Sequence, residues 1–368
     1  MKSTTRLMVA MLTLGFTVMS LPSLAQVPVK LNAKYLQREI NAPALVKTQL
    51  ETQRKLISTN KYNFAVGFTK VSGKQLATIT GEKEISSTQA NQLKQTVSRR
   101  VLSAGALEIT KVNLATCVAS KKAYDARSLG YVSPIKDQRC GNCWSYSACA
   151  AFESSYKRVN GSFVDASEQQ VVNCSNGGDC IDGGFTYLVF EWMVGNNKNL
   201  EKESVLPDGG TKNACAGTTP GTNYFASDWG IVDPSNDINK IASVANIKNA
   251  LCKYGVIAAS VYVTPLFQNY ASGVFYEFPN NTADPVSNHA IDIVGWDDDK
   301  GAWLIKNSWG TDWGEDGYMW IKYNSNNIGR RAAWVVAKKA PVVFKPATEI
   351  KAEPVRKINT PVIKKIGN

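Results

Sequence analysis

The stretch Cys140-Gly141-Asn142-Cys143-Trp144 opens the segment that decides the fold of this chain. Over residues 143–158 the apolar side chains recur mainly at the period of a helix, so we predict a helix that begins at Cys143. The N-terminal end of a helix carries a partial positive charge and unpaired amides, which favour a negative sulfur. We therefore expect a lowered pKa for the Cys143 thiol.

Strand patterns follow this helix further along the chain. A second helix is predicted over residues 185–194, and segments rich in β-branched and aromatic residues predict strands at 256–263, 290–296, 302–306 and 318–323. Helices that precede strands indicate an α+β protein of two lobes, with a cleft between them.

One histidine, His289, is present in the 368 residues, and it stands at the entrance to the predicted strand 290–296. A thiol nucleophile needs a base, a group that orients the base, and donors for the oxyanion. His289 is the candidate base. Asn307 is the candidate orienting group, with Trp309 excluding water. Taken singly, a lone histidine is more often structural and an asparagine is more often a turn residue.

The composition divides the chain into parts. All eight cysteines, all nine tryptophans and the histidine lie within residues 116–337, which we take as the working domain. Residues 26–115 contain none of them and are expected to form a small α+β pro-segment. Within it, a strand is predicted at 62–68, and Ser86 or Ser87 is expected to cap a helix whose apolar positions are Leu93, Val97 and Val101.

The first 25 residues have the pattern of a cleaved secretory signal. Lys2 and Arg6 precede an apolar run over 7–21, and small residues follow at 23–25. Polar residues and glycine interrupt the run, so we expect no permanent transmembrane anchor of about 20 apolar residues. Export to an extracellular, periplasmic or lysosome-like compartment would allow disulfides to persist.

Half of the net charge of +12 lies at the C-terminal end of the chain, and the first 25 residues add a further +2. Residues 338–368 hold eight Lys or Arg and two Glu, and their Lys- and Pro-rich composition predicts a disordered tail. The alternative is that this basic tail has a function, either as an electrostatic tether to an anionic cell surface or as a secretion signal. The charge left elsewhere is small and lacks an aromatic and basic groove pattern, so we expect no nucleic-acid partner.

Several motifs together resemble the papain family of cysteine peptidases. They are the quoted Cys140–Trp144 stretch with Gln138 before it, the segment Lys306-Asn307-Ser308-Trp309-Gly310, and the glycine-rich segment 313–318. The resemblance covers about residues 124–334. It implies a papain-like fold with a helical lobe over about 125–225, a β-barrel-like lobe over about 226–337, and the active site in the cleft between them.

The resemblance also implies a role for each matching residue. Cys143 would be the nucleophile, His289 the general acid and base, and Asn307 the orienting group. Gln138 would form the oxyanion hole with the Cys143 backbone amide. Only Arg139 separates Gln138 from Cys140, where the family usually has two residues, so the loop must be shortened while its glutamine still reaches the cleft.

The family pattern further implies two disulfides, Cys140 with Cys180 and Cys174 with Cys215. Cys149 is expected to be a buried core thiol. Two further cysteines, Cys117 and Cys252, have no family counterpart. We expect them either to form a disulfide with each other or to stay reduced. The rival interpretation of Cys140 and Cys143 is a redox pair, or a zinc knuckle that Cys174 and Cys180 would complete. We expect neither a metal nor an organic cofactor.

Substrate-binding residues are implied in the same way. Gly183 and Gly184 would pair with the backbone of an extended peptide. Phe185, Ser260 and Ala290 would line the pocket for the side chain second from the cut bond, where we expect a medium apolar residue. Trp309 completes this set.

These observations predict a secreted, monomeric cysteine endopeptidase made as a zymogen. Its partners would be polypeptide substrates and its own pro-segment, acting as an intramolecular inhibitor. Two alternatives remain: an acyltransferase or exopeptidase on the same fold, or a catalytically inactive binding module.

Overall fold

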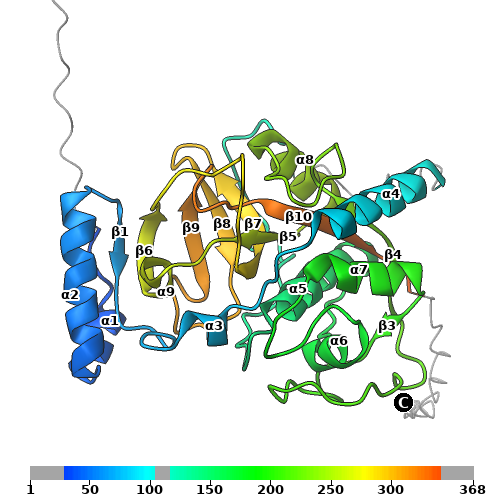
Figure 1. Ribbon diagram of the computed structural model, residues 1–368, viewed down its shortest axis with the longest axis horizontal. Coiled ribbons are helices and arrows are strands. Elements are labelled where there is room, and N and C mark those ends of the chain that lie inside the picture. The colour runs from blue at the N-terminus through cyan, green and yellow to red at the C-terminus, as the bar shows by residue number, and fades with distance from the viewer. Residues whose placement is uncertain (1–28, 104–116, 341–368) are drawn as a thin grey trace, which may run out of the picture.

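The computed structural model describes residues 29–103 and 117–340 of the chain (Figure 1). The expected secretory signal and nearly all of the expected basic tail lie outside these residues. The expectation of an α+β protein with a helical lobe and a β lobe is confirmed. No helix in the described ranges is long and apolar enough to cross a bilayer.

One extended sheet forms the β lobe and continues to the back of the helical lobe. All of its neighbouring strands are antiparallel except β6 and β9, and β2 (Ala123–Asp125) pairs with β7 off the main path. The strand order along that path is β1 (Phe64–Val66), β6 (Tyr270–Phe275), β9 (Tyr318–Lys322), β8 (Ala302–Lys306), β7 (His289–Asp297), β5 (Ile257–Val261), β10 (Arg330–Ala337), β4 (Tyr224–Ile231) and β3 (Asn199–Leu200).

The predicted helix at Cys143 is confirmed as α5 (Cys143–Asn160), which ends at Gly161 in the left-handed conformation. Its first fourteen residues are buried on every side, so it is not the one-faced helix that its periodicity suggested. The reason is its position between the sheet and the neighbouring helices α6 (Glu168–Cys174) and α7 (Thr186–Gly195). A helix covered all round marks the centre of a domain.

Two further helices cover the β lobe. In α8 (Val244–Tyr254) the first turn is capped by Ser243, whose side chain accepts from the Asn246 amide. The short helix α9 (Pro265–Gln268) is capped in the same way by Thr264. Both helices place apolar side chains in the core of that lobe.

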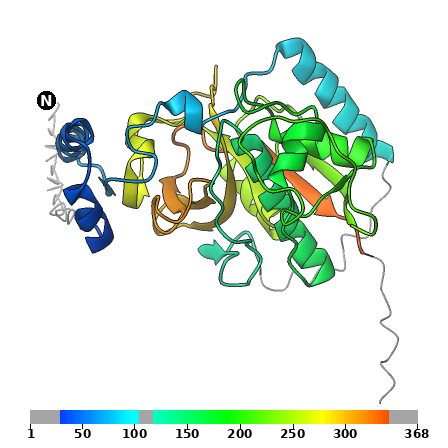
Figure 2. The same ribbon diagram turned by 90° about the horizontal axis from the view of Figure 1, so that it is seen from below.

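The N-terminal segment crosses both lobes, as Figures 1 and 2 show. Its helices α1 (Ala33–Ile40) and α2 (Ala44–Thr59) lie with β1 at the end of the sheet, where β1 pairs with β6. The chain then passes through α3 (Leu76–Ile79) between the lobes and continues into α4 (Ser87–Ser103) beside α7.

The helix predicted to follow Ser86 or Ser87 is therefore present, and Ser86 is its cap. Its hydroxyl accepts from the Gln89 amide, while the Gln89 side chain accepts from the Ser86 amide, which is a reciprocal capping box. Leu93 and Val97 are buried in the core of the helical lobe, as their spacing indicated. The N-terminal segment thus contributes to the cores of both lobes.

Three disulfides stabilise the described part of the chain. They are Cys140–Cys180, Cys174–Cys215 and Cys117–Cys252, while Cys143 and Cys149 are buried and free. The first two are the pairings that the family pattern implies, and the third resolves the open pair. With their sulfurs bonded in this way, Cys140, Cys174 and Cys180 present no free thiolate of the kind that a zinc knuckle uses.

Candidate active site

Cys143 lies at the first residue of α5, between the two lobes. The side chain is fully buried, and the Ala290 amide donates to its sulfur at 3.4 Å. Because Ala290 follows His289 at the start of β7, this contact brings the sulfur next to the only histidine of the chain. The sulfur and the histidine therefore come from different lobes and are brought together through the Ala290 backbone, with no hydrogen bond between the thiol and Nδ1 in this form.

Asn307 holds the imidazole in place. The Oδ1 atom of Asn307 lies 2.8 Å from the Nε2 atom of His289, and it also accepts from the Ser308 amide at 2.8 Å. Since this oxygen is an acceptor, Nε2 carries the proton and donates. The Nδ1 atom is buried without a hydrogen-bond partner among the described residues, and is thus the atom that is free to take a proton.

Trp309 covers the imidazole, with the two ring centroids 4.7 Å apart. Together with burial of the whole site, this contact excludes water. Burial lowers the pKa of His289 to about 4, although the hydrogen bond to Asn307 acts to raise it. The imidazole is therefore neutral at pH 7 in this form of the protein.

Burial likewise raises the pKa of the Cys143 thiol to about 12, although backbone amides of Ala290, Gly81 and Trp144 act in the opposite direction. The sequence predicted a lowered pKa from the helix terminus alone. The difference arises because residues 79–84 cover the sulfur in this structure, with the Gly81 amide against it.

The segment that covers the site runs between the lobes and pairs with both. The Gly81 and Glu82 amides donate to the Asn288 carbonyl at 3.1 and 3.0 Å on the β-lobe side. On the helical-lobe side the Gly184 amide donates to the Gly81 carbonyl at 2.7 Å, and the Lys83 amide donates to the Gly184 carbonyl at 3.2 Å. The bridge between Glu82 and Gly184 is parallel.

Glycines make this close passage feasible. A Cβ atom on Gly81 would lie 1.8 Å from the carbonyl oxygen of Gly141, and one on Gly183 would lie 2.1 Å from the Gly81 carbonyl oxygen. Gly183 also has a φ of +78°, which side chains disfavour. Gly183 and Gly184, expected to pair with a peptide backbone, thus contact an extended chain in this structure.

Gln138 faces the covered site. Its Nε2 atom donates to the Ile79 carbonyl at 3.1 Å and to the Cys140 carbonyl at 2.7 Å, while Oε1 accepts from the Ser308 hydroxyl at 2.6 Å. The backbone amide of Gln138 also donates to the Ser308 backbone carbonyl at 2.8 Å. The shortened loop therefore still brings this side chain beside Asn307 and against the covering segment.

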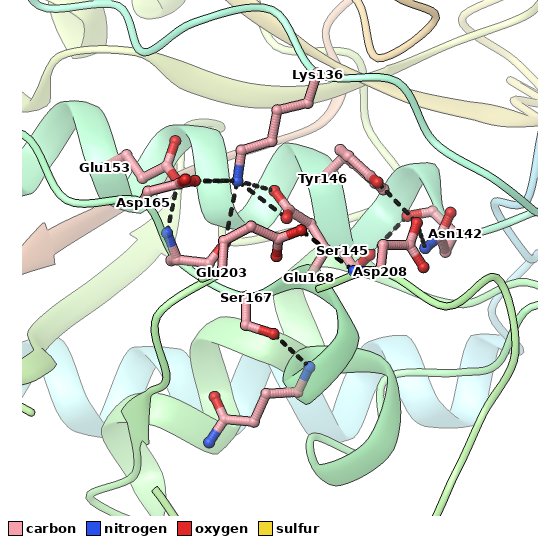
Figure 3. A network of polar contacts seen from close by, with 12 residues as sticks. Lys136, Asn142, Ser145, Tyr146, Glu153, Asp165, Ser167, Glu168, Glu203 and Asp208 are labelled. Atoms are coloured by element: carbon pink, nitrogen blue, oxygen red, sulfur yellow. Dashed lines mark hydrogen bonds and ion pairs between the residues drawn. The ribbon is translucent and has the colours of Figure 1, made fainter. Parts of the chain in front are cut away.

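A largely buried charge cluster anchors that loop, with Asp165 at its exposed edge (Figure 3). The Lys136 ammonium lies 2.8 Å from a Glu168 oxygen, 2.7 Å from Asp165 and 3.4 Å from Glu153. Burial raises the pKa of Glu168 well above its usual value, against the charge of Lys136. The sequence alone gives no sign of this cluster, because its members belong to no motif and meet only in the folded protein.

The residues expected around the second side chain from the cut bond are also brought together. Ser260 and Ala290 are paired across β5 and β7, and the Ser260 hydroxyl donates to a carboxylate oxygen of Glu82. An additional residue, Arg331, lies over the ring of Phe185 with its guanidinium carbon 5.5 Å from the centroid, and forms an ion pair with Glu82. Nothing in the sequence pattern had singled out this arginine.

Comparison with known proteins gives consistent results. The family profile described as "Papain family cysteine protease" matches residues 120–338. Cathepsin K of Gallus gallus is 32% identical over 206 residues, which make up 55% of this chain and 59% of that protein. Cysteine proteinase 3 of Solanum lycopersicum is 33% identical over 227 residues, 60% of this chain and 61% of its own. The chain spans about three fifths of the length of these curated relatives.

Solved precursors show the same fold over more of the chain. The digestive procathepsin L2 proteinase from Tenebrio molitor larval midgut superposes with a TM-score of 0.63 at 24% identity, covering 84% of this chain and 95% of that one. A recombinant stem bromelain precursor gives a TM-score of 0.57 at 22% identity, covering 85% and 95%. At these identities the likeness concerns the fold alone.

Proposed function

Because this chain belongs to the papain family of cysteine proteases, we propose that it is an exported cysteine endopeptidase made as an inactive precursor. The observation that carries this proposal is the convergence of Cys143, His289 and Asn307 at the boundary of the two lobes. Residues 116–337 would be the peptidase domain, working as a monomer on polypeptide substrates without a cofactor.

The proposed reaction follows from the positions of these groups. The Cys143 sulfur attacks the carbonyl carbon of the peptide bond while the thiol proton passes to His289 Nδ1. The oxygen of the tetrahedral adduct accepts hydrogen bonds from Gln138 Nε2 and from the Cys143 backbone amide.

The same histidine then completes both halves of the reaction. Its proton goes to the leaving amine as the carbon–nitrogen bond breaks, which leaves a thioester on Cys143. Water gives a proton to His289 and attacks the thioester, which releases the carboxylate and returns the thiol. The hydrogen bond from Nε2 to Asn307 keeps the ring in the orientation and tautomer that both proton transfers require.

Residues 26–115 would act as the inhibitory pro-segment. Support comes from the passage of 79–84 across Cys143 and from the likeness to solved proforms. In this form the neutral thiol and the neutral imidazole are both buried, so attack on a substrate is blocked by exclusion as well as by protonation state.

Among the alternatives, an exopeptidase is disfavoured by one observation. The covering segment enters the site from α3 and leaves it towards α4, so a chain with residues on both sides fits between the lobes. An inactive binding module is disfavoured because thiol, imidazole and amide are all present and hydrogen bonded. An acyltransferase differs only in the acceptor that resolves the thioester.

The test is cleavage of a peptide library by the activated protein, with Cys143→Ala as the matched control. We expect shortened peptides with free termini from the wild type and none from the variant. Joined products would favour transfer to an amine. Equal cleavage by the variant would exclude the thiol mechanism.

A further inference from the structure

The side chain of Glu82 enters a recess beside the active site and meets a positive charge there. Its carboxylate accepts from the Ser260 hydroxyl and forms an ion pair with Arg331 at 3.3 Å. Both side chains of this ion pair are only 2% exposed. A charge-assisted contact that is shielded from water in this way is stronger than one at the surface.

A bulge in β10 places this arginine. Pairing with β5 joins Arg330 to Ser260 and Ala333 to Ala258, so β10 holds one more residue than its partner between these points. Arg331 occupies the bulge with a φ of +53°, in the left-handed region that side chains disfavour. A bulge re-aims a side chain, and strain of this kind persists where the surrounding structure fixes it.

The partners of the Arg331 guanidinium are supplied by the covering segment. In the described ranges its hydrogen bonds and ion pairs go to Glu82, the Lys83 carbonyl and Glu84. The guanidinium also lies over the ring of Phe185. When the segment leaves, the buried positive charge loses these partners, and the recess gains a strong preference for an anionic group.

The recess is also placed correctly for a substrate side chain. Glu82 forms a parallel β-bridge with Gly184. The residue before it, Gly81, places its backbone amide against the Cys143 sulfur. Its side chain contacts Ser260, one of the residues expected to line the pocket for the side chain second from the cut bond.

We propose that Arg331 is a specificity-determining residue that selects peptides with Asp or Glu as the second residue on the N-terminal side of the cut bond. This inference rests on the proposed peptidase function and replaces the expectation of a medium apolar side chain. Glu82 then occupies the same pocket in the precursor as the acidic side chain of a substrate.

The test uses the activated enzyme and matched peptides that differ only in carrying Glu, Gln or Leu at each of the four positions before the cut bond. For wild type we expect kcat/KM at the second position to be about tenfold or more higher with Glu than with Gln or Leu, since a buried charged partner commonly has an effect of this size.

Variants separate local recognition from a general charge effect. Arg331→Asn removes the charge while its side chain tolerates a positive φ, and should bring the Glu-to-Gln ratio close to one. Arg331→Lys should restore part of the preference. Arg139→Asn removes an exposed arginine elsewhere near the active site and should leave the ratio unchanged.

The outcomes distinguish the two proposals. Cleavage of Gln or Leu peptides as efficiently as Glu peptides by wild type would overturn the role of Arg331 and leave the peptidase intact. An unchanged Glu preference in Arg331→Asn, with the variant still folded by circular dichroism, would do the same. Absence of cleavage of every peptide, with Cys143 still reactive toward iodoacetamide, would instead count against the peptidase function.

Discussion

The amide of Gln138 is held at both ends, because Nε2 donates to the Ile79 and Cys140 carbonyls while Oε1 accepts from Ser308. The Cys140 and Ser308 contacts do not involve residues 79–84, so they still orient the donor after the cover has left. For Gln138→Ala we expect kcat to fall about 100-fold or more with little change in KM, since an oxyanion donor acts mainly in the transition state. Steady-state kinetics on one peptide substrate measures both constants.

Ser308→Ala is the matched control for that substitution. It removes the hydrogen bond that orients the Gln138 amide but keeps the donor, so its loss in kcat should be much smaller. If both variants lose activity equally, Gln138 acts by positioning its neighbours and the oxyanion role is wrong.

At this scale the sequence was informative where a functional residue stands inside a motif. Cys143 and Asn307 are each embedded in such a motif, and His289 has no competitor because the chain contains one histidine. Arg331 had no such signal. Its position depends on a strand bulge and a left-handed backbone, which arise from sheet pairing and not from neighbouring residues.

Among the elements, the segment between α3 and α4 depends on a glycine. Because a Cβ atom on Gly81 would lie 1.8 Å from the Gly141 carbonyl oxygen, Gly81→Ala must push two backbones apart. We expect this overpacking to weaken the cover by about 1–3 kcal/mol. The intact precursor should then hydrolyse a small peptide substrate faster than the wild-type precursor, measured as an initial rate before gels show any processing.

Thr88→Ala in the exposed first turn of α4 provides the comparison. It changes the helix that follows the covering segment, without a clash, and should leave the precursor as inactive as the wild type. An inactive Gly81→Ala precursor would mean that residues 79–84 do not control access to Cys143.

The sequence also predicted elements unevenly. Strands β5, β7, β8 and β9 were found because β-branched and aromatic residues are concentrated in them, and turns separate them. Strands β4 and β10 and helix α8 were missed. β4 contains Ser, Asp and Gly, and β10 begins with two arginines, so their strand conformation depends on pairing with each other and with β5.

For the whole molecule, acid should loosen the closed precursor. The covered form holds the pKa of His289 at about 4, below its ordinary value of 6.5, so the covered form binds fewer protons than the uncovered form between these values. Burial alone would raise the pKa of Glu84, but Arg330 and Arg331 hold it below its usual value. Both shifts have the same sign, and the cover loses stability as pH falls below about 6.5.

Hydrogen exchange followed by mass spectrometry measures this opening in a Cys143→Ala precursor, which cannot process itself. After correction for the intrinsic pH dependence of exchange, amides of residues 79–84 should exchange faster at pH 4.5 than at pH 7, while those of α5 stay protected. Equal or slower exchange of 79–84 at the lower pH would contradict the linkage.

The Cys117–Cys252 disulfide ties the start of the proposed peptidase domain to helix α8. Whichever bond upstream of Cys117 is cut during maturation, the stub that remains is anchored covalently at the same point. Cleavage at several neighbouring bonds would therefore give products that differ in mass at the N-terminus, while the disulfide holds the N-terminal end of each product at the same place.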